Sequence, residues 1–166
     1  FISSVSTLGS GISNYASQNV GARKLDRVKA GFGAGVKMLA VICLSFTALY
    51  LLAGRPLLLL FMNDPTAEAV STGVAFFHIV SPFYVLLAFK LSSDGLMRGC
   101  GMMGRFMATT LSDMFLRMTL AVVFARMFGV NGTWLAWPVG WCVGSGLSVV
   151  FYGTSIARWT EEKTSL

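Results

Sequence analysis

Two groups of charged side chains lie within apolar stretches of the chain, at spacings that could support chemistry. Asp113 and Arg117 are four residues apart, so on a helix they share one face and can form an ion pair. Lys90, Asp94 and Arg98 repeat this spacing in an earlier stretch. Charges are costly to bury in an apolar environment and often mark a route for a substrate or an ion. Both groups are therefore candidates for such a route.

Each group also has a purely structural interpretation. Asp113 and Arg117 would act either as a gate or substrate-sensing pair on a cavity wall, or as an ion pair that locks two helices together. Lys90 and Asp94 would either line the same route or serve helix packing, and Arg98 would anchor the end of its helix. The sequence leaves these alternatives open.

His78 is the only histidine, and an imidazole can exchange protons near neutral pH. It lies one helical turn before Pro82, where a proline would free a backbone carbonyl. A lone histidine without an acidic neighbour in sequence is more often a packed or interfacial residue, so both interpretations remain. Pro82 and Pro138 are each expected to bend the helix that contains them.

The composition is that of a membrane protein. Hydrophobic residues make up 55% of the 166 residues, charged residues make up 12%, and the mean hydropathy is +0.70. A soluble domain usually carries about 25% charged residues. The runs 38–54, 69–89 and 127–157 contain no Asp, Glu, Lys or Arg, and a membrane-spanning helix needs about 20 mostly apolar residues. We therefore predict an all-α membrane protein, built as a bundle of transmembrane helices.

Five helical segments are predicted, at about 1–18, 32–60, 65–98, 104–127 and 133–157. They amount to about four full spans and the end of a fifth, whose beginning is expected to precede Phe1. A basic cytoplasmic loop is predicted over 19–31, between the first two helices. Gly31 and Gly35 have the small-xxx-small spacing that lets membrane helices approach each other closely.

Basic residues are concentrated on one side of the predicted bundle. If the helices cross alternately, the segments 19–37, 98–105 and 158–166 share one side and hold nine Lys and Arg residues, whereas the other side has only Arg55 and Arg126. The positive-inside rule places the basic side, and with it the C-terminus, in the cytoplasm. This asymmetry explains the net charge of +6. The expected partner is therefore the lipid bilayer, and no nucleic acid partner is expected.

No catalytic or cofactor-binding motif is recognisable. The sequence lacks a Gly-rich phosphate loop, an HExxH motif and a GxSxG motif. Cys43, Cys100 and Cys142 have no metal-binding spacing, so neither a metal site nor a cofactor is expected. A membrane-embedded enzyme would need a cluster of His, Asp or Glu, which one histidine and two acids within the spans do not supply. We therefore do not expect an enzyme.

Four segments, in order along the chain, resemble the multidrug and toxic compound extrusion (MATE) family. They are SQNVGARKLDRVKAGF, RPLLLLFMNDPTAEAV, SPFYVLLAF together with GLMRGCG, and GVNGTWLAWPVGW. The residues of the first segment that form the cytoplasmic loop motif are Gln18, Asn19, Gly21, Ala22 and Arg27. The resemblance implies two six-helix lobes that face a central cavity. This chain would be part of the C-terminal lobe, from the end of the eighth helix to the twelfth.

The resemblance also implies a function. MATE-like proteins exchange cationic or amphipathic organic compounds for H⁺ or Na⁺ by alternating access, as multi-pass proteins of the plasma membrane, which in bacteria is the inner membrane. The segment FYVLLAFKL lacks the acidic residue often found midway along the tenth helix, which favours H⁺ coupling through an acid in the N-terminal lobe. That missing lobe would be the partner of this chain, which alone is not expected to transport.

Two other functions remain open. A lipid-linked oligosaccharide flippase of the same superfamily would favour more cations lining its cavity, and Lys90 and Arg117 are the candidates here. A non-transporting membrane scaffold is compatible with the number of spans. The upstream reading frame would test the exporter interpretation, which requires further spans with a second Q-x-x-G-A motif and would be overturned by a soluble domain there.

Overall fold

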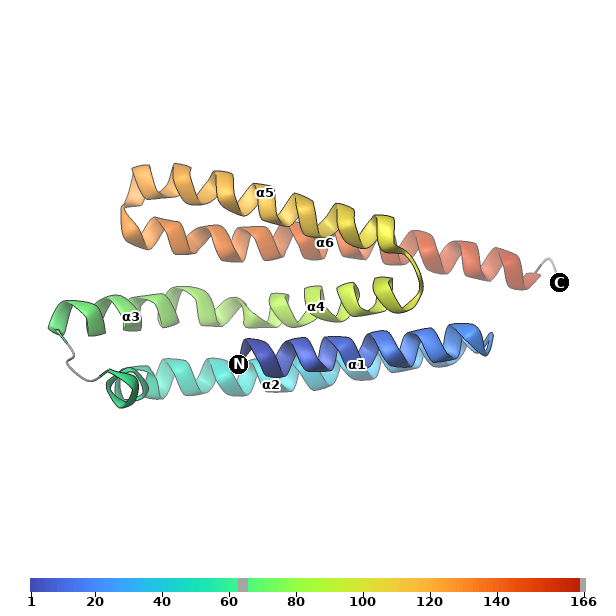
Figure 1. The fold of residues 1–166 in the computed structure, drawn as a ribbon, viewed down its shortest axis with the longest axis horizontal. Helices are drawn as coiled ribbons and strands as arrows, with labels where there is room; N and C mark the ends of the chain where they lie inside the picture. The colour runs from blue at the N-terminus through green and yellow to red at the C-terminus, as the bar shows by residue number, and fades with distance from the viewer. Residues whose placement is uncertain (63–65, 165–166) are drawn as a thin grey trace.

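Long α-helices make up the chain over residues 1–62 and 66–164, which the computed structural model describes, with side chains up to residue 154. The elements are α1 (Ile2–Gly21), α2 (Leu25–Phe61), α3 (Ala67–Val80), the 3-10 helix η1 (Ser81–Phe83), α4 (Tyr84–Gly99), α5 (Met103–Phe128) and α6 (Val130–Thr164). They lie side by side as a bundle of rods (Figure 1). Within the described residues, four stretches are long and apolar enough to cross a membrane: Leu25–Phe61, Ala67–Gly99, Met103–Phe128 and Val130–Thr154. The predicted all-α membrane fold is confirmed.

Helix α4 forms the centre of the bundle. Figure 1 shows α3 and α4 between the α1–α2 pair and the α5–α6 pair, and α4 contacts α1, α2, α5 and α6. Every residue from Ser92 to Met97 is buried, so this part of the helix is covered on all sides. Charged residues in this part of α4 therefore face protein rather than lipid.

The connection between α1 and α2 is shorter than the loop predicted over 19–31. Only Ala22–Lys24 separate the two helices, so Arg27 and Lys29 belong to the first turns of α2. The chain reverses at Arg23, which has a left-handed φ of +56° and lies two residues beyond Gly21, the last residue of α1. Polarity suggested a long loop here, but a single left-handed residue makes a long loop unnecessary.

The predicted helix 65–98 is divided at Pro82. Helix α3 ends at Val80, and η1 separates it from α4, as expected where a proline cannot continue the hydrogen-bond ladder. Thr47 of α2 supports this bend, because its hydroxyl donates to the carbonyl of Ser81 at 2.7 Å. The hydrogen bond fixes α2 against the point at which α3 gives way to α4.

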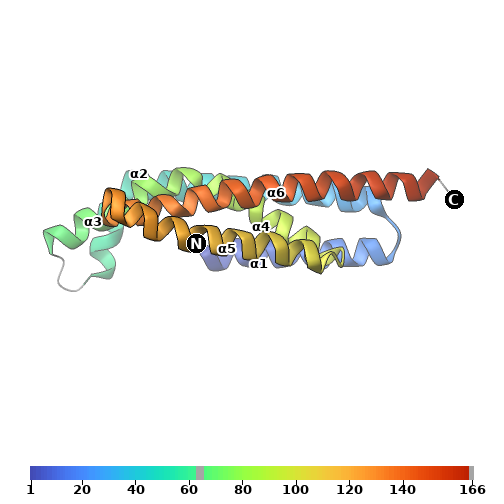
Figure 2. The ribbon, with the colours of Figure 1, turned by 90° about the horizontal axis from the view of Figure 1, so that it is seen from above.

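A bend that the sequence analysis did not predict lies in α2. Ala53 has non-helical angles, φ −122° and ψ 17°, three residues before Pro56, and the last turns of α2 point away from the rest of the helix (Figure 1, Figure 2). Pro138, by contrast, lies within α6, which continues through it. Helix α6 also begins before the predicted residue 133, at Val130, because Gly129 makes the turn with a φ of +66°.

Glycines bring the backbones of α1 and α4 into direct contact. A Cβ atom added at Gly95 would meet the carbonyl oxygen of Gly9, and one added at Gly99 would meet the carbonyl oxygen of Ser13. A backbone carbonyl cannot rotate out of the way as a side chain can. Any larger residue at these positions must therefore separate the two helices.

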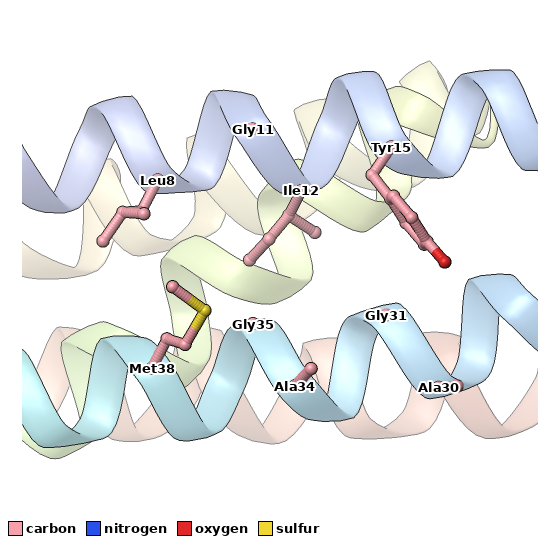
Figure 3. Close-up of a pocket in the computed structure, with 9 residues that line it drawn as sticks. All are labelled: Leu8, Gly11, Ile12, Tyr15, Ala30, Gly31, Ala34, Gly35 and Met38. Atoms are coloured by element: carbon pink, nitrogen blue, oxygen red, sulfur yellow. The ribbon is translucent and has the colours of Figure 1, made fainter.

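The predicted close approach at Gly31 and Gly35 of α2 is also present. Figure 3 shows Tyr15 and Ile12 of α1 pointing toward these two glycines, and a Cβ added at Gly35 would lie 2.6 Å from Cδ1 of Ile12. A groove of about 460 Å³ remains open along this contact, with Leu8 and Met38 among its lining residues.

Replacing Gly95 with alanine is expected to lower the melting temperature of the protein in detergent, because the added methyl group pushes α1 away from α4. Overpacking of this kind costs about 1–3 kcal/mol. Gly11→Ala is the matched control, since a Cβ there meets nothing within 4 Å and alanine favours a helix over glycine. Equal melting temperatures for the two variants would contradict the close contact.

The basic segments lie at one end of the bundle. The α1–α2 connection, the α4–α5 connection and the C-terminal end of α6 are at the same end in Figure 1, whereas the end of α2 and the start of α3 are at the other, together with the α5–α6 turn. The α4–α5 connection includes Gly101, with a φ of +73°. This arrangement agrees with the alternating crossing from which the charge asymmetry was counted.

Candidate functional site

A cavity of about 600 Å³ lies between the first turns of α1 and the helices α2 to α6. Each labelled α-helix contributes to it. Its lining residues are Phe1, Ile2, Ser3, Ser6, Tyr50, Phe76, Phe77, Val80, Tyr84, Leu87, Lys90, Leu91, Asp113, Arg117, Trp137 and Trp141. The lining is therefore largely aromatic and apolar, with a few charged groups at defined positions, which is the usual composition of a small-molecule site.

Connected aromatic rings form one side of the cavity, called here the aromatic wall. Tyr84 stacks on Phe1 with ring centroids 4.3 Å apart, and its ring lies 6.1 Å from that of Trp141. Tyr50 stacks on Phe77 at 4.5 Å and lies 6.0 Å from Tyr84. Such rings offer large apolar faces of fixed shape. The aromatic wall suits a flat organic compound.

The first ion pair lies entirely on α4. Nζ of Lys90 donates to Oδ2 of Asp94 at 2.7 Å, and only 6% and 7% of the two side chains are exposed. Pairing offsets part of the cost of removing the two charges from water. Arg98, the third residue of this stripe, is exposed and lies over the ring of Phe106 at 5.2 Å, so it does not join the pair.

The second ion pair lies on α5. Nη2 of Arg117 is 2.9 Å from Oδ2 of Asp113, and the exposed fractions of the side chains are 30% and 4%. The guanidinium also lies 5.3 Å from the centre of the Trp137 ring, at the distance of a cation–π contact. The pair therefore connects α5 to α6 through an aromatic ring.

Two glycines of α6 bring the ion pairs together. A Cβ atom added at Gly140 would lie 2.6 Å from Oδ1 of Asp113, and one at Gly144 would lie 3.0 Å from Cε of Lys90 and 3.7 Å from Cβ of Asp113. Pairs from two different helices thus meet on one face of α6. The small-xxx-small spacing of GWCVG is the sequence signal that could have indicated this close contact.

Each acid of the two pairs keeps one buried oxygen without a hydrogen-bond partner. Among the described residues this holds for Oδ1 of Asp94 and Oδ1 of Asp113, and Nε of Arg117 is also buried and unpartnered. An unsatisfied buried polar atom costs about 1–3 kcal/mol. The place where α4, α5 and α6 meet therefore holds unused hydrogen-bonding capacity.

His78 lies apart from these ion pairs. It is exposed and lines a separate groove of about 620 Å³, formed by α2 and α3, together with Arg55 and Ser71. The structure therefore does not bring His78 to the acids that sequence reasoning grouped with it as route candidates.

The loop motif lies at the opposite end of α1 from the cavity. Asn19 is buried and stabilises the turn through two hydrogen bonds. Its side-chain Nδ2 donates to the backbone carbonyl of Tyr15 at 2.8 Å, and its backbone carbonyl accepts from the backbone N–H of Lys24 at 2.8 Å. The exposed members of the motif are Gln18, Gly21, Ala22 and Arg27. The contacts of this motif are those of a helix-to-helix turn.

Comparisons with known proteins agree with this geometry. The MatE family model matches residues 1–123. The fold is similar to a solved structure described as the inward-facing conformation of a multidrug resistance MATE family transporter of the MOP superfamily, with a TM-score of 0.82 and 15% sequence identity. The match covers 95% of this chain and 38% of that chain. A comparison with curated proteins gives no match.

Proposed function

Because this chain belongs to the MatE family, we propose that it forms part of a secondary exporter. The exporter exchanges a cationic or amphipathic organic compound for H⁺, or for Na⁺, by alternating access between the two sides of the membrane. In this proposal the chain supplies the wall of the substrate cavity and the ion pairs beside it.

One observation carries the proposal: a cavity of about 600 Å³ is lined both by aromatic rings and by charged residues of membrane-spanning helices. Charges at such depth are costly and are usually kept for a route or a switch. A purely structural ion pair would be better placed between tightly packed helices than beside a cavity. Asp113 and Arg117, which line the cavity, are therefore proposed as the substrate-sensing pair.

The charges around the cavity favour H⁺ as the coupling ion. Both acids are already paired with a cation, at 2.7 Å for Asp94 and 2.9 Å for Asp113. Little negative charge is left in this part of the protein to hold Na⁺. We propose that the coupling acid lies in a second lobe.

A second lobe would complete the exporter, since this chain spans 38% of the length of the solved transporter that it resembles. We propose a plasma membrane location, the inner membrane in a bacterium, with the basic end of the bundle in the cytoplasm. A reporter fused after Leu166 is then expected to be active in the cytoplasm. Activity on the outer side would refute this orientation.

Transport is tested with the protein encoded by the complete reading frame, in inside-out vesicles and with a panel of cationic and anionic fluorescent dyes. An acidic lumen is expected to drive dye uptake, and a protonophore is expected to abolish it. A Na⁺ gradient applied at constant pH identifies the alternative ion. If no dye accumulates under either gradient, the export proposal fails.

A lipid-linked oligosaccharide flippase of the same superfamily is the second candidate, favoured by Lys90 and Arg117 in the cavity lining. Such a protein would accumulate none of the dyes and would instead move a labelled lipid-linked sugar between leaflets. A scaffold would do neither.

A further inference from the structure

The most exposed charged side chain in the cavity is positive, although each of the two ion pairs is neutral overall. About a third of the Arg117 side chain is exposed, at 30%, whereas the Lys90 and Asp113 side chains are 6% and 4% exposed. Of the charged residues that line the cavity, Arg117 therefore has the most exposed side chain.

Neither oxygen of Asp113 is exposed and unpaired. Its Oδ2 is held by Arg117 at 2.9 Å, and its Oδ1 is buried against α6, 2.6 Å from the point where a Cβ of Gly140 would lie. An organic cation would have to displace Arg117 before it could pair with this carboxylate. Displacing this partly buried guanidinium would break the ion pair between Arg117 and Asp113, so the site disfavours cationic groups.

Arg117 has hydrogen-bond donors to spare. A guanidinium carries five N–H groups in a planar fork, and the ion pair uses Nη2. Nε has no partner among the described residues but is buried, so it becomes available to a bound compound only if the guanidinium turns. The guanidinium lies over Trp137, whose ring is 6.0 Å from that of Trp141 in the aromatic wall. An anionic group bound to Arg117 would therefore sit beside an aromatic body bound to the wall.

We propose that this cavity selects amphipathic compounds that combine a flat aromatic body with one carboxylate group. The aromatic wall receives the body, and Arg117 receives the carboxylate through charge-assisted hydrogen bonds, in competition with Asp113. The inference rests on the proposed function and narrows its substrate class, because it selects organic acids over organic cations.

The test compares two dyes of the same xanthene shape, anionic fluorescein and cationic rhodamine 123, by fluorescence polarisation with the purified full-length protein. Charge-assisted hydrogen bonds of this kind favour fluorescein by about tenfold in Kd. Arg117→Gln is expected to remove the preference, and Arg117→Lys is expected to keep part of it, since lysine retains the charge but lacks the fork. Arg126→Gln is the matched control, because Arg126 is exposed on the same helix and is not among the residues that line the cavity.

Asp113→Asn gives the sharpest outcome. It removes the carboxylate that competes for Arg117, so fluorescein is expected to bind more tightly than to the wild type. If Asp113 instead receives organic cations, the same variant loses rhodamine 123 binding and gains nothing for fluorescein. That result, or tighter wild-type binding of rhodamine 123, or binding of neither dye, overturns the inference.

The outcomes also separate this inference from the export proposal. Gradient-driven uptake of rhodamine 123 by a protein that does not bind fluorescein leaves the exporter standing and refutes the acid-selective site. Fluorescein binding that follows the expected variant pattern, without gradient-driven uptake of any dye, supports the site and refutes export.

Discussion

Replacing Lys90 with methionine is expected to lower the free energy of unfolding by about 3–5 kcal/mol, the usual cost of removing one member of a buried ion pair. Lys90 and Asp94 are 2.7 Å apart with 6% and 7% of their side chains exposed, at the centre of a helix that other helices cover. Without Lys90, Asp94 is left as a buried charge with no cation in contact. Thermal or denaturant unfolding of the purified full-length protein measures the loss.

The double variant Lys90→Met/Asp94→Leu is the control. Apolar residues of similar volume in place of a buried pair are often neutral or stabilising, so the double variant is expected to recover most of the loss. A double variant as unstable as Lys90→Met alone would contradict this explanation. It would mean that packing around α4, rather than the unpaired charge, sets the stability.

Replacing Gly140 with alanine is expected to abolish most of the gradient-driven uptake, because the new methyl group occupies the space of the second ion pair. A Cβ there lies 2.6 Å from Oδ1 of Asp113 and closer still to Cγ of Arg117, so both side chains must shift. Overpacking costs about 1–3 kcal/mol of stability, and displacement of Arg117 removes its position over Trp137. Uptake is measured in inside-out vesicles at matched protein levels.

Gly146→Ala is the matched control for Gly140→Ala. It lies on the same helix, and a Cβ there meets nothing within 4 Å. Uptake by Gly146→Ala is expected to equal that of the wild type. If Gly140→Ala also transports at the wild-type rate, the ion pair on α5 is a packing feature and not part of the substrate route.

Local features of the site could be predicted from the sequence. The four-residue spacing of Lys90 with Asp94, and of Asp113 with Arg117, brings both pairs within reach on one face of a helix, although Arg98, at the same spacing from Asp94, lies over Phe106 instead. The helical spans followed from charge-free apolar runs for the same local reason. Pro82 ended a helix because a proline removes a backbone donor, but the same rule did not hold at Pro138, through which α6 continues.

Features that depend on which helices are neighbours could not be predicted. The meeting of the two ion pairs at Gly140 and Gly144 requires α6 to pack against both α4 and α5. The spacing of the two glycines indicates a close contact on α6 but does not say which helices make it. His78 was grouped with the acids by residue type, but the order of the helices puts it in a different groove. The short α1–α2 connection depends on Arg23 adopting a left-handed conformation, which is rare outside glycine, asparagine and aspartate.

Substrate protection of a cysteine in the cavity tests whether the cavity beside the two ion pairs binds the transported compound. The native cysteines Cys43, Cys100 and Cys142 are replaced by alanine, and Ser6→Cys is labelled with a water-soluble thiol reagent. Ser6 lines the cavity, whereas Ser10, one turn further along α1, is exposed and is not among the lining residues. We predict that a transported dye slows the labelling of Ser6→Cys and leaves that of Ser10→Cys unchanged. Labelling of Ser6→Cys at the same rate with and without a dye that the vesicles accumulate would show that the transported compound does not bind in this cavity.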